Sequence, residues 1–370
     1  MSGKWETEEL HVGAVMEATF WPNPIKDSGF RFRATHLDGK RAPKVVLSDD
    51  VRIRPGIPAL VKIAAIRKPE RDDRGTIEVE FVRSQELKLE GVYVDPIVAR
   101  KLQVLLESGL NILLDGPQGC GKTTLAKTIA TELGYEFIFF NCGAVVEATD
   151  FLAAIHVQAS ESGAPVTAFV KTEILVALET ANDHPEKRYL VFLDELNRCP
   201  ESARNALMPA LDGSRRVFHP IKNAFLAIPD NVQFVAAVNR GSQFSATFGI
   251  DAAQLDRFAP LTLGYPPADA EAKLLAARHP ELPAGLIDDL VRVANAIRGS
   301  QDLRGGLSVR ATDEACVYLK HPVFESDQRR SLPEILKSSF CGRFSGHVDD
   351  VSSDAGVAWT LIEKELAKTS

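Results

Sequence analysis

The stretch LLDGPQGCGKTTLA, from Leu113 to Ala126, decides the fold. An apolar run reaches Asp115, a glycine-rich turn follows it, and a helical pattern opens at Lys122. Within the stretch, the residues from Gly116 to Thr123 fit the spacing G-x-x-x-x-G-K-[ST]. Glycines let the backbone turn so sharply that several N–H groups point at one anion, and the start of a helix adds a partial positive charge. The stretch therefore predicts a site that holds the phosphates of a nucleotide.

Each polar residue of this turn has a chemical role in the prediction. The Lys122 ammonium group reaches the β- and γ-phosphates, and the Thr123 hydroxyl binds Mg²⁺. Cys120 lies beside the start of the helix, a position that lowers the pKa of a thiol, although a small side chain in a tight turn is the simpler interpretation. The predicted nucleotide-binding residues are Gly116, Pro117, Gln118, Gly119, Cys120, Gly121, Lys122, Thr123 and Thr124.

A second stretch, LVFLDELNR from Leu190 to Arg198, contains two acidic residues that suit hydrolysis of a bound nucleotide. Its apolar first residues predict a buried strand, and Asp194 follows at the carboxyl end, where a carboxylate can hold Mg²⁺. Glu195 is placed to accept a proton from the attacking water or to orient that water. Ligands of open α/β sheets bind at the carboxyl ends of the strands, so both stretches converge on one site. The predicted metal ligands are Thr123 and Asp194.

Composition excludes several classes of protein. With 370 residues, 45% of them hydrophobic and 25% charged, the chain has a globular composition and is long enough for two or three domains. The net charge of −7 gives no overall reason to bind nucleic acid. The five cysteines are scattered without the spacing of a metal site, and from the polar start MSGKWETEEL we expect no secretory signal. No apolar run reaches about 18 residues, so we expect a soluble, cytoplasmic protein that does not contact a membrane.

The hydrophobic pattern divides the chain into three parts. Residues 1–88 are β-rich, with runs such as TIEVEFV (Thr76 to Val82) that alternate apolar and polar residues between turn signals. About five such short strands predict a small barrel or curled sheet, most commonly an OB-like barrel. Residues 89–266 alternate apolar strands with helices, which predicts an α/β core with a parallel sheet between helices. Residues 267–370 show helical patterns, which predict a helical lid and a C-terminal helix from Asp349 to Lys368.

Local signals place the elements of the α/β part. A helix is predicted to follow Asp95 as its N-cap, with Pro96 at its first position and Gly109 just past its end. Four short apolar runs predict buried parallel strands. These runs are NILLDG, YEFIFFN, RYLVFLDE and VQFVAAVN.

On these motifs the sequence resembles the AAA+ ATPases, and more narrowly their MoxR-like branch, which includes the CbbQ/NorQ type and the McrB/dynein-related type. The resemblance covers residues 90–320. LDELNR resembles the Walker B segment of that branch, and FVAAVNR resembles its sensor 1 strand, which implies that Asn239 lies beside Glu195 and positions the water. AAQLDRF resembles the segment whose arginine, here Arg257, reaches the nucleotide of a neighbouring subunit. LSVRATDEA resembles sensor 2 of the lid, with Arg310 near the γ-phosphate.

The resemblance implies an ATP hydrolase that works as a ring, typically a hexamer, with ATP and Mg²⁺ at each junction between subunits. The catalytic residues are then Lys122, Glu195, Asn239, Arg257 and Arg310. From the residues alone, Asn239 also suits a turn cap, Arg257 and Arg310 also suit exposed positions, and Arg198 and Arg240 are rivals of Arg257 as the arginine that acts in trans. McrB-like GTP users carry a longer signature near sensor 1 than VNRGSQ, which favours ATP.

Two functions are open from the sequence. In the first, ATP hydrolysis remodels a partner protein, as the MoxR-like chaperones imply. In the second, the chain is the nucleic-acid-binding motor subunit of a defence or DNA-processing system that acts with a separate nuclease. Residues 20–68 carry eleven Lys or Arg against four Asp or Glu, which suits single-stranded nucleic acid. Phe169 and the basic stretch GSRRVFHPIK are candidates for contact with the substrate, core packing being the alternative for Phe169 and a solvated hairpin the alternative for the basic stretch.

Overall fold

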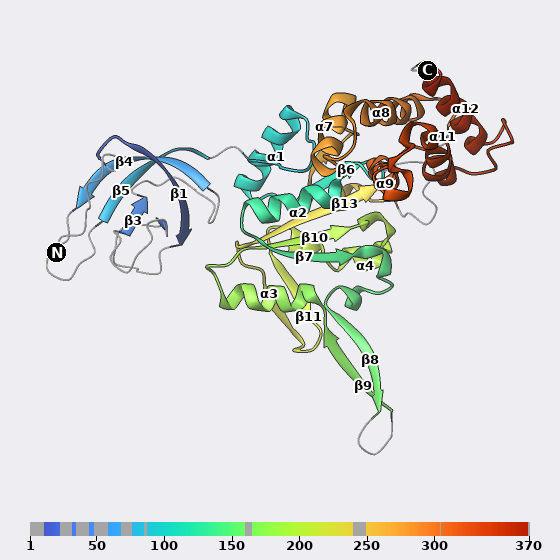
Figure 1. The fold of residues 1–370 in the computed structure, drawn as a ribbon. Coiled ribbons are helices and arrows are strands. Elements are labelled where there is room, and N and C mark those ends of the chain that lie inside the picture. The colour runs from blue at the N-terminus through green and yellow to red at the C-terminus, as the bar shows by residue number, and fades with distance from the viewer. Residues whose placement is uncertain are drawn as a thin grey trace.

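A computed structural model describes residues 11–22, 32–34, 44–47, 58–67, 76–84, 87–159, 165–239, 249–303 and 305–368. Figure 1 shows three parts in the order that the sequence predicts: a β-barrel that lies to one side, an α/β core, and a group of helices at the C-terminal end. No helix within the described residues is both long and apolar enough to cross a membrane.

The N-terminal part is a closed five-stranded barrel with the strand order β1-β2-β3-β5-β4. Strands β3 and β5 run parallel, and the other neighbours are antiparallel. This order is that of the OB-fold, so the predicted OB-like barrel is confirmed. In β5 the predicted alternation holds, because Ile77 and Val79 are buried in the barrel core. The strands are β1 Val15–Pro22, β2 Phe32–Ala34, β3 Lys44–Leu47, β4 Pro58–Arg67 and β5 Thr76–Ser84.

The core holds a parallel sheet with the strand order β14-β6-β13-β10-β7. Its strands are β6 Ile112–Gly116, β7 Glu136–Asn141, β10 Tyr189–Asp194, β13 Val232–Asn239 and β14 Ala259–Thr262. Side chains alternate across this sheet: Leu190 and Phe192 pack toward helices α1 and α2, whereas Val191 and Leu193 pack toward α3. Both faces are thus covered, which explains the continuous apolar runs of β6, β10 and β13 (Figure 1). The prediction of a buried strand is wrong for YEFIFFN, because β7 is an edge strand whose residues are exposed or only partly buried. The helices of this part are α1 Pro96–Ser108, α2 Lys122–Glu132, α3 Glu173–Asp183, α4 Glu201–Asn205, α5 Met208–Leu211 and α6 Ala252–Leu255.

Helix α1 begins and ends where the local signals place it. The Asp95 side chain accepts hydrogen bonds from the backbone N–H groups of Ile97 and Val98, at 2.8 and 3.3 Å. Pro96 is the first helical residue, and Gly109 closes the helix in the left-handed conformation at φ 69°.

The register of the sheet determines which residues lie together at the carboxyl ends of its strands. Asn239 at the end of β13 pairs with Gly116 at the end of β6, and Asp194 at the end of β10 pairs with Asn141 at the end of β7. These residues share the carboxyl edge of the sheet, which is the edge where ligands of open α/β sheets bind.

The C-terminal helices form a core of their own, which includes Leu290, Ile297 and Leu336. The predicted C-terminal helix is wrong at its start, because it begins at Asp354 rather than Asp349. The Ser353 hydroxyl accepts a hydrogen bond from the Gly356 N–H at 3.1 Å, so Ser353 is the N-cap and the residues before it form turns. The helices are α7 Ala268–Arg278, α8 Ala284–Gly299, α9 Val309–Leu319, α10 Pro322–Glu325, α11 Gln328–Ser339 and α12 Asp354–Leu366.

Two hairpins extend from the core beside α3: β8 Ala153–Ala159 with β9 Pro165–Lys171, and β11 Arg216–His219 with β12 Ala224–Ala227 (Figure 1). The basic stretch lies in the second hairpin, which agrees with the alternative given for it, while its contact with a substrate stays a prediction. Phe169 is 49% exposed on β9, so the alternative of core packing is wrong. Phe218 and Phe225 of the second hairpin are also exposed, with their ring centroids 5.8 Å apart.

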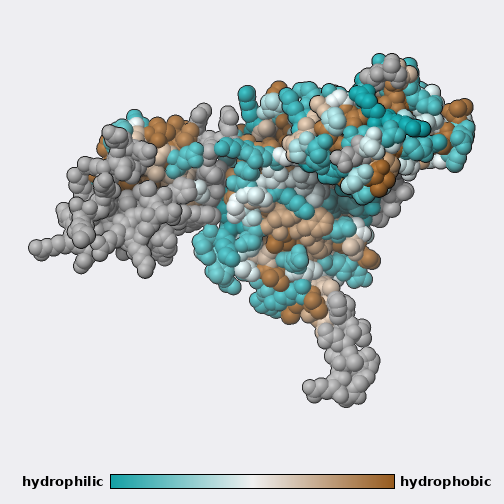
Figure 2. Space-filling view, in the orientation of Figure 1, coloured by the Kyte–Doolittle hydropathy of each residue, from teal (hydrophilic) through white to brown (hydrophobic). Residues whose placement is uncertain are grey.

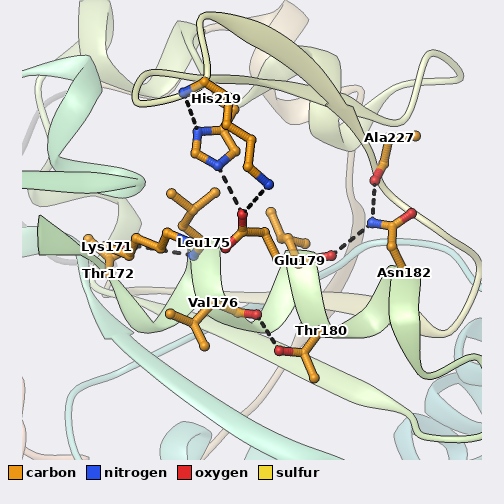
Figure 3. A network of polar contacts seen from close by, with 11 residues as sticks. Lys171, Thr172, Leu175, Val176, Glu179, Thr180, Asn182, His219 and Ala227 are labelled. Carbon is orange, nitrogen blue, oxygen red and sulfur yellow. Dashed lines mark hydrogen bonds and ion pairs between the residues drawn. The ribbon is translucent and has the colours of Figure 1, made fainter. Parts of the chain in front are cut away.

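Glu179 of α3 joins both hairpins to the core (Figure 3). Its carboxylate lies 2.6 Å from the Lys171 ammonium of β9, 2.6 Å from the Lys222 ammonium and 3.1 Å from Nε2 of the buried His219. These hydrogen bonds, those from Lys171 and Lys222 first, lower the pKa of Glu179 to about 2.

Replacing Glu179 with glutamine is expected to lower the free energy of unfolding by about 1 to 2 kcal/mol at pH 7, because three donors lose their anionic partner. The folded-state pKa lies below the ordinary value of 4.5, so the ionised carboxylate stabilises the fold at every pH above about 4.5. That contribution is lost as the pH falls from about 4.5 to about 2, and the gap between wild type and variant should shrink below pH 5. Urea unfolding at several pH values from 7 down to about 2.5 measures the gap, with Glu173→Gln on the exposed face of α3 as the control. A constant gap would contradict the prediction.

Candidate nucleotide-binding and hydrolysis site

A cavity of about 340 Å³ opens at the carboxyl edge of the sheet, between the core and the C-terminal helices. It brings together residues from both predicted motifs and from the predicted lid. Its lining includes Gln118, Gly119, Cys120, Gly121, Lys122, Thr123, Thr124, Asp194, Glu195, Asn239, Val309 and Arg310. Asn239 and Arg310 are thus placed with the Gly116–Thr123 loop, as the sequence predicts.

The glycines of the loop are required by its geometry. Gly119 and Gly121 have φ values of +71° and +102°, which L side chains rarely adopt. A Cβ atom on Gly116 would lie 2.5 Å from the Leu263 carbonyl oxygen, and one on Gly119 would lie 2.2 Å from Cβ of Ser308, the N-cap of α9. The loop is therefore packed directly against the lid, with its N–H groups held in a tight turn.

Replacing Gly119 with alanine is expected to weaken ATP binding at least about tenfold, because the new Cβ displaces Ser308 and with it the start of α9, which carries Arg310. Gly134→Ala is a matched control, since Gly134 also has a positive φ of +64° but open space around it. Both variants share the backbone strain, and only the first has the clash. Fluorescent-nucleotide titration measures the affinity, and equal losses in the two variants would contradict the packing argument.

Lys122 is almost fully buried at 6% exposure. Its ammonium group donates to the carbonyl oxygens of Gly116 and Pro117, at 2.9 and 2.8 Å. Burial lowers the pKa of Lys122 from its ordinary value, and the nearby Asp194 and Asp115 act in the opposite direction. A phosphate bound in the loop would add a negative charge beside this cation, so binding and the charged form of Lys122 favour each other.

The expected effect of the helix start on Cys120 is wrong. Burial raises the pKa of the Cys120 thiol above its ordinary value, and this outweighs the opposing effect of Lys122. Cys120 is 7% exposed, so it acts as a small buried side chain in the tight turn.

The two predicted metal ligands lie next to each other. The Thr123 hydroxyl donates to the Asp194 carboxylate at 3.1 Å, although 71 residues separate them in the chain. Hydroxyl and carboxylate oxygens are the hard ligands that Mg²⁺ prefers, and Mg²⁺ commonly binds through one or two such groups together with substrate phosphates. The donor set therefore fits Mg²⁺ bound with a nucleotide.

Glu195 follows Asp194 in a left-handed backbone conformation, with φ 54°. Its N–H donates to the Asp194 carboxylate at 2.9 Å, which fixes the turn. Glu195 lines the cavity, and its carboxylate lies 3.3 Å from the Arg198 guanidinium. Asn239 is held close by, because the side-chain amide of Asn197 donates to its carbonyl oxygen at 3.1 Å.

Sequence reasoning missed the lid residues Arg278 and Asp313 and the segment Gly91–Tyr93, which also line the cavity. The Arg278 guanidinium donates to the Gly91 carbonyl oxygen at 3.0 Å and lies 3.4 Å from the Asp313 carboxylate. His279 also contacts that carboxylate, at 3.1 Å. These contacts join α7, α9 and the segment before α1 around one end of the cavity.

The lid is fixed against the loop by a second set of contacts. Glu271 of α7 is fully buried and accepts hydrogen bonds from Arg298 of α8 and from the Thr312 hydroxyl of α9, the latter at 2.7 Å. Arg298 stacks over the ring of Tyr265, at 4.8 Å from its centroid. The Tyr265 hydroxyl donates to the Gln118 carbonyl oxygen at 3.0 Å, so the three lid helices and the loop are connected.

Arg257 lies apart from this cavity. Its carbonyl oxygen accepts a hydrogen bond from Asn111, which precedes β6, so Arg257 sits at the opposite edge of the sheet from the loop. Its guanidinium donates to the Ala253 carbonyl oxygen at 2.6 Å. A role for Arg257 at a neighbouring subunit's nucleotide stays a prediction. Its rival Arg240 lies outside the described residues.

Comparison with known proteins finds relatives of the core. BssE of Thauera aromatica, whose name marks it as a candidate chaperone, is 27% identical over 205 residues, which are 55% of this chain and 67% of that protein. An uncharacterized protein of Staphylococcus saprophyticus is 24% identical over 239 residues, which are 65% of this chain and 85% of that protein. Among solved structures, the RuvB Holliday junction branch migration motor of Thermotoga maritima aligns with 75% of this chain and 88% of its own, at 17% identity and a TM-score of 0.41. Residues 111–258 match the family model described as the AAA domain of the dynein-related subfamily. Residues 111–258, the core of the chain, therefore form an AAA domain of the dynein-related subfamily.

Proposed function

We propose that this chain is an ATPase that assembles into a ring, a hexamer by family resemblance, and uses ATP hydrolysis to remodel a partner protein in the cytoplasm. The observation that carries the proposal is the cavity itself. It combines a phosphate-binding loop, a hydroxyl–carboxylate pair for Mg²⁺ and an adjacent carboxylate for the water, all under a lid that carries an arginine.

Each polar residue of the cavity has a distinct role in the proposed hydrolysis of ATP. Lys122 and the N–H groups of the loop bind the β- and γ-phosphates, and Arg310 reaches them from the lid. Thr123 and Asp194 would hold Mg²⁺, which would supply positive charge beside the phosphate oxygens. Glu195, with Asn239 beside it, orients a water for in-line attack on the γ-phosphorus and receives its proton as ADP leaves.

Two observations favour a protein as the object of remodelling. The relative BssE bears a chaperone's name, and the resemblance to the MoxR-like branch points in the same direction. The two hairpins held by Glu179 present exposed apolar side chains, among them Phe169, Phe218 and Phe225. Figure 2 shows that apolar surface also gathers on the lower part of the core. Exposed apolar surface of this kind marks contact with other macromolecules.

A second candidate function is supported by the barrel. OB-fold barrels bind oligonucleotides on one face, and residues 20–68 have an excess of seven positive charges. A motor subunit that acts on single-stranded nucleic acid with a separate nuclease would use this module as its platform.

Phosphate release from ATP and Mg²⁺, measured with and without single-stranded DNA at two salt concentrations, tests both candidates. Hydrolysis that DNA leaves unchanged supports protein remodelling, whereas DNA stimulation that falls steeply with salt supports the second candidate. Sedimentation with and without ATP tests the ring. A monomer that hydrolyses ATP at the full rate would reject assembly, and a protein that does not bind ATP would reject the proposal.

A further inference from the structure

The ion pair between Glu195 and Arg198 is built into the turn that follows the sheet. Residues Leu196–Arg198 form a short 3₁₀ turn directly after Glu195, and the Arg198 N–H donates back to the Glu195 carbonyl oxygen at 2.8 Å. This turn returns the arginine to the side of the carboxylate. Nη1 of Arg198 then lies 3.3 Å from Oε2 of Glu195.

A second turn packs against the same carboxylate oxygen, Oε2 of Glu195. A Cβ atom on Gly143 would lie 3.4 Å from Oε2 of Glu195 and 3.5 Å from Cδ of Arg198, so this turn packs against both partners. The turn, Cys142–Ala144, is itself fixed, because the Asn141 side chain accepts a hydrogen bond from the Gly143 N–H at 2.9 Å. Oε2 of Glu195 is thus held between two ordered loops that follow neighbouring strands, β7 and β10.

The other carboxylate oxygen of Glu195 is differently placed. Glu195 lines the cavity, and Oε1 makes no hydrogen bond to any of the described residues. Arg198 is absent from the cavity lining formed by those residues. The carboxylate of Glu195 therefore has one anchored oxygen, Oε2, and one oxygen, Oε1, that no described residue holds.

We propose that Arg198 is a positioning residue for hydrolysis in its own subunit: it anchors Oε2 of Glu195 so that Oε1 is aimed at the attacking water. The inference rests on the proposed ATPase function and gives Arg198 a role in cis, in place of a contact with a neighbour's nucleotide. The side chains of Arg198 and Glu195 are 39% and 23% exposed, so the pair adds little to stability. Its effect is on orientation, and a displacement of about 1 Å at a reacting group can cost about 100-fold in rate.

Steady-state hydrolysis by the full-length protein separates positioning from a structural role. Arg198→Ala should lower kcat about 10- to 100-fold with KM for ATP nearly unchanged, because the contact is made to Glu195 and not to the nucleotide. Arg198→Lys should recover part of the rate, since an ammonium can pair with Oε2 but lacks the planar fork. Arg330→Ala, which removes an exposed lid arginine, is the matched control and should behave as wild type. An equal or higher kcat in Arg198→Ala, or a loss confined to KM, would overturn the assignment.

A double-mutant cycle tests whether Arg198 acts through Glu195. In a Glu195→Gln background, adding the substitution Arg198→Ala should leave the single-turnover rate unchanged, because the oriented base is already gone. A further loss as large as the one that Arg198→Ala causes in the wild-type background would assign Arg198 to a different target and overturn the proposal.

A mixing experiment distinguishes cis from trans action. Arg198→Ala subunits mixed with Lys122→Ala subunits should show no recovery of hydrolysis, because the only subunits able to bind ATP lack their own Arg198. Recovery would mean that a neighbour supplies the arginine and would overturn the proposal. A wild-type protein that does not hydrolyse ATP would reject the proposed function itself, a result distinct from each of these.

Discussion

The variant Glu195→Gln is expected to hydrolyse ATP about 100- to 10,000-fold more slowly than wild type while still binding it. Glutamine keeps the size of the side chain and one oxygen, so the turn at φ 54° and its contact with Asp194 should persist. It cannot take the proton of the attacking water, which is the role assigned to this residue. The substitution does not alter the Gly116–Thr123 loop that is proposed to bind the phosphates. The affinity for ATP should therefore change by less than about threefold.

Two measurements on the same preparation check this result. Phosphate release gives the rate, and fluorescent-nucleotide titration gives the affinity. Glu186→Gln is the control, because it removes an equal charge from the exposed chain before β10, away from the cavity. A variant that keeps more than about a tenth of the wild-type rate would exclude Glu195 as the group that activates the water. Loss of binding together with rate would instead assign it a role in nucleotide binding.

Much of the core could be predicted because its signals are local. The cap at Asp95, the glycine at position 109 and the apolar runs of the strands each act within a few residues, and the structure places the elements there. The parallel order then brings Gly116, Asp194 and Asn239 to one edge, which follows from the rule for open α/β sheets.

The parts of the site that sequence reasoning missed depend on contacts between distant segments. Arg278 meets Gly91 across 187 positions of the chain, and no pattern near either residue signals the contact. The raised pKa of the Cys120 thiol has the same origin, because burial by surrounding elements outweighs the local effect of the helix start. The exposure of Phe169 follows from its hairpin extending away from the core, which periodicity cannot distinguish from a buried strand.

The geometry at Arg257 leads to a prediction about assembly. Arg257 lies at the amino edge of the sheet, next to Asn111, whereas the phosphate-binding loop lies at the carboxyl edge of the same strand, β6. The Arg257 guanidinium therefore cannot contact a γ-phosphate that is bound in its own subunit. If it stabilises the charge that builds on a neighbour's γ-phosphate, Arg257→Ala should lower kcat about 1,000- to 100,000-fold. ATP binding by each subunit should remain, because the residues of the cavity are unchanged.

Mixing Arg257→Ala with Lys122→Ala subunits provides the decisive measurement. At a junction where an Arg257→Ala subunit binds ATP and a Lys122→Ala neighbour supplies Arg257, the site is complete, so part of the hydrolysis should return although each variant alone is inactive. The same mixture made with Arg198→Ala should stay at the reduced rate of that variant, since that arginine is proposed to act within its own subunit. Arg257→Lys should recover little, because an ammonium does not reproduce the planar fork of a guanidinium. Hydrolysis at the wild-type rate by Arg257→Ala alone would exclude a trans role, and the ring would then need another explanation than completion of its active sites.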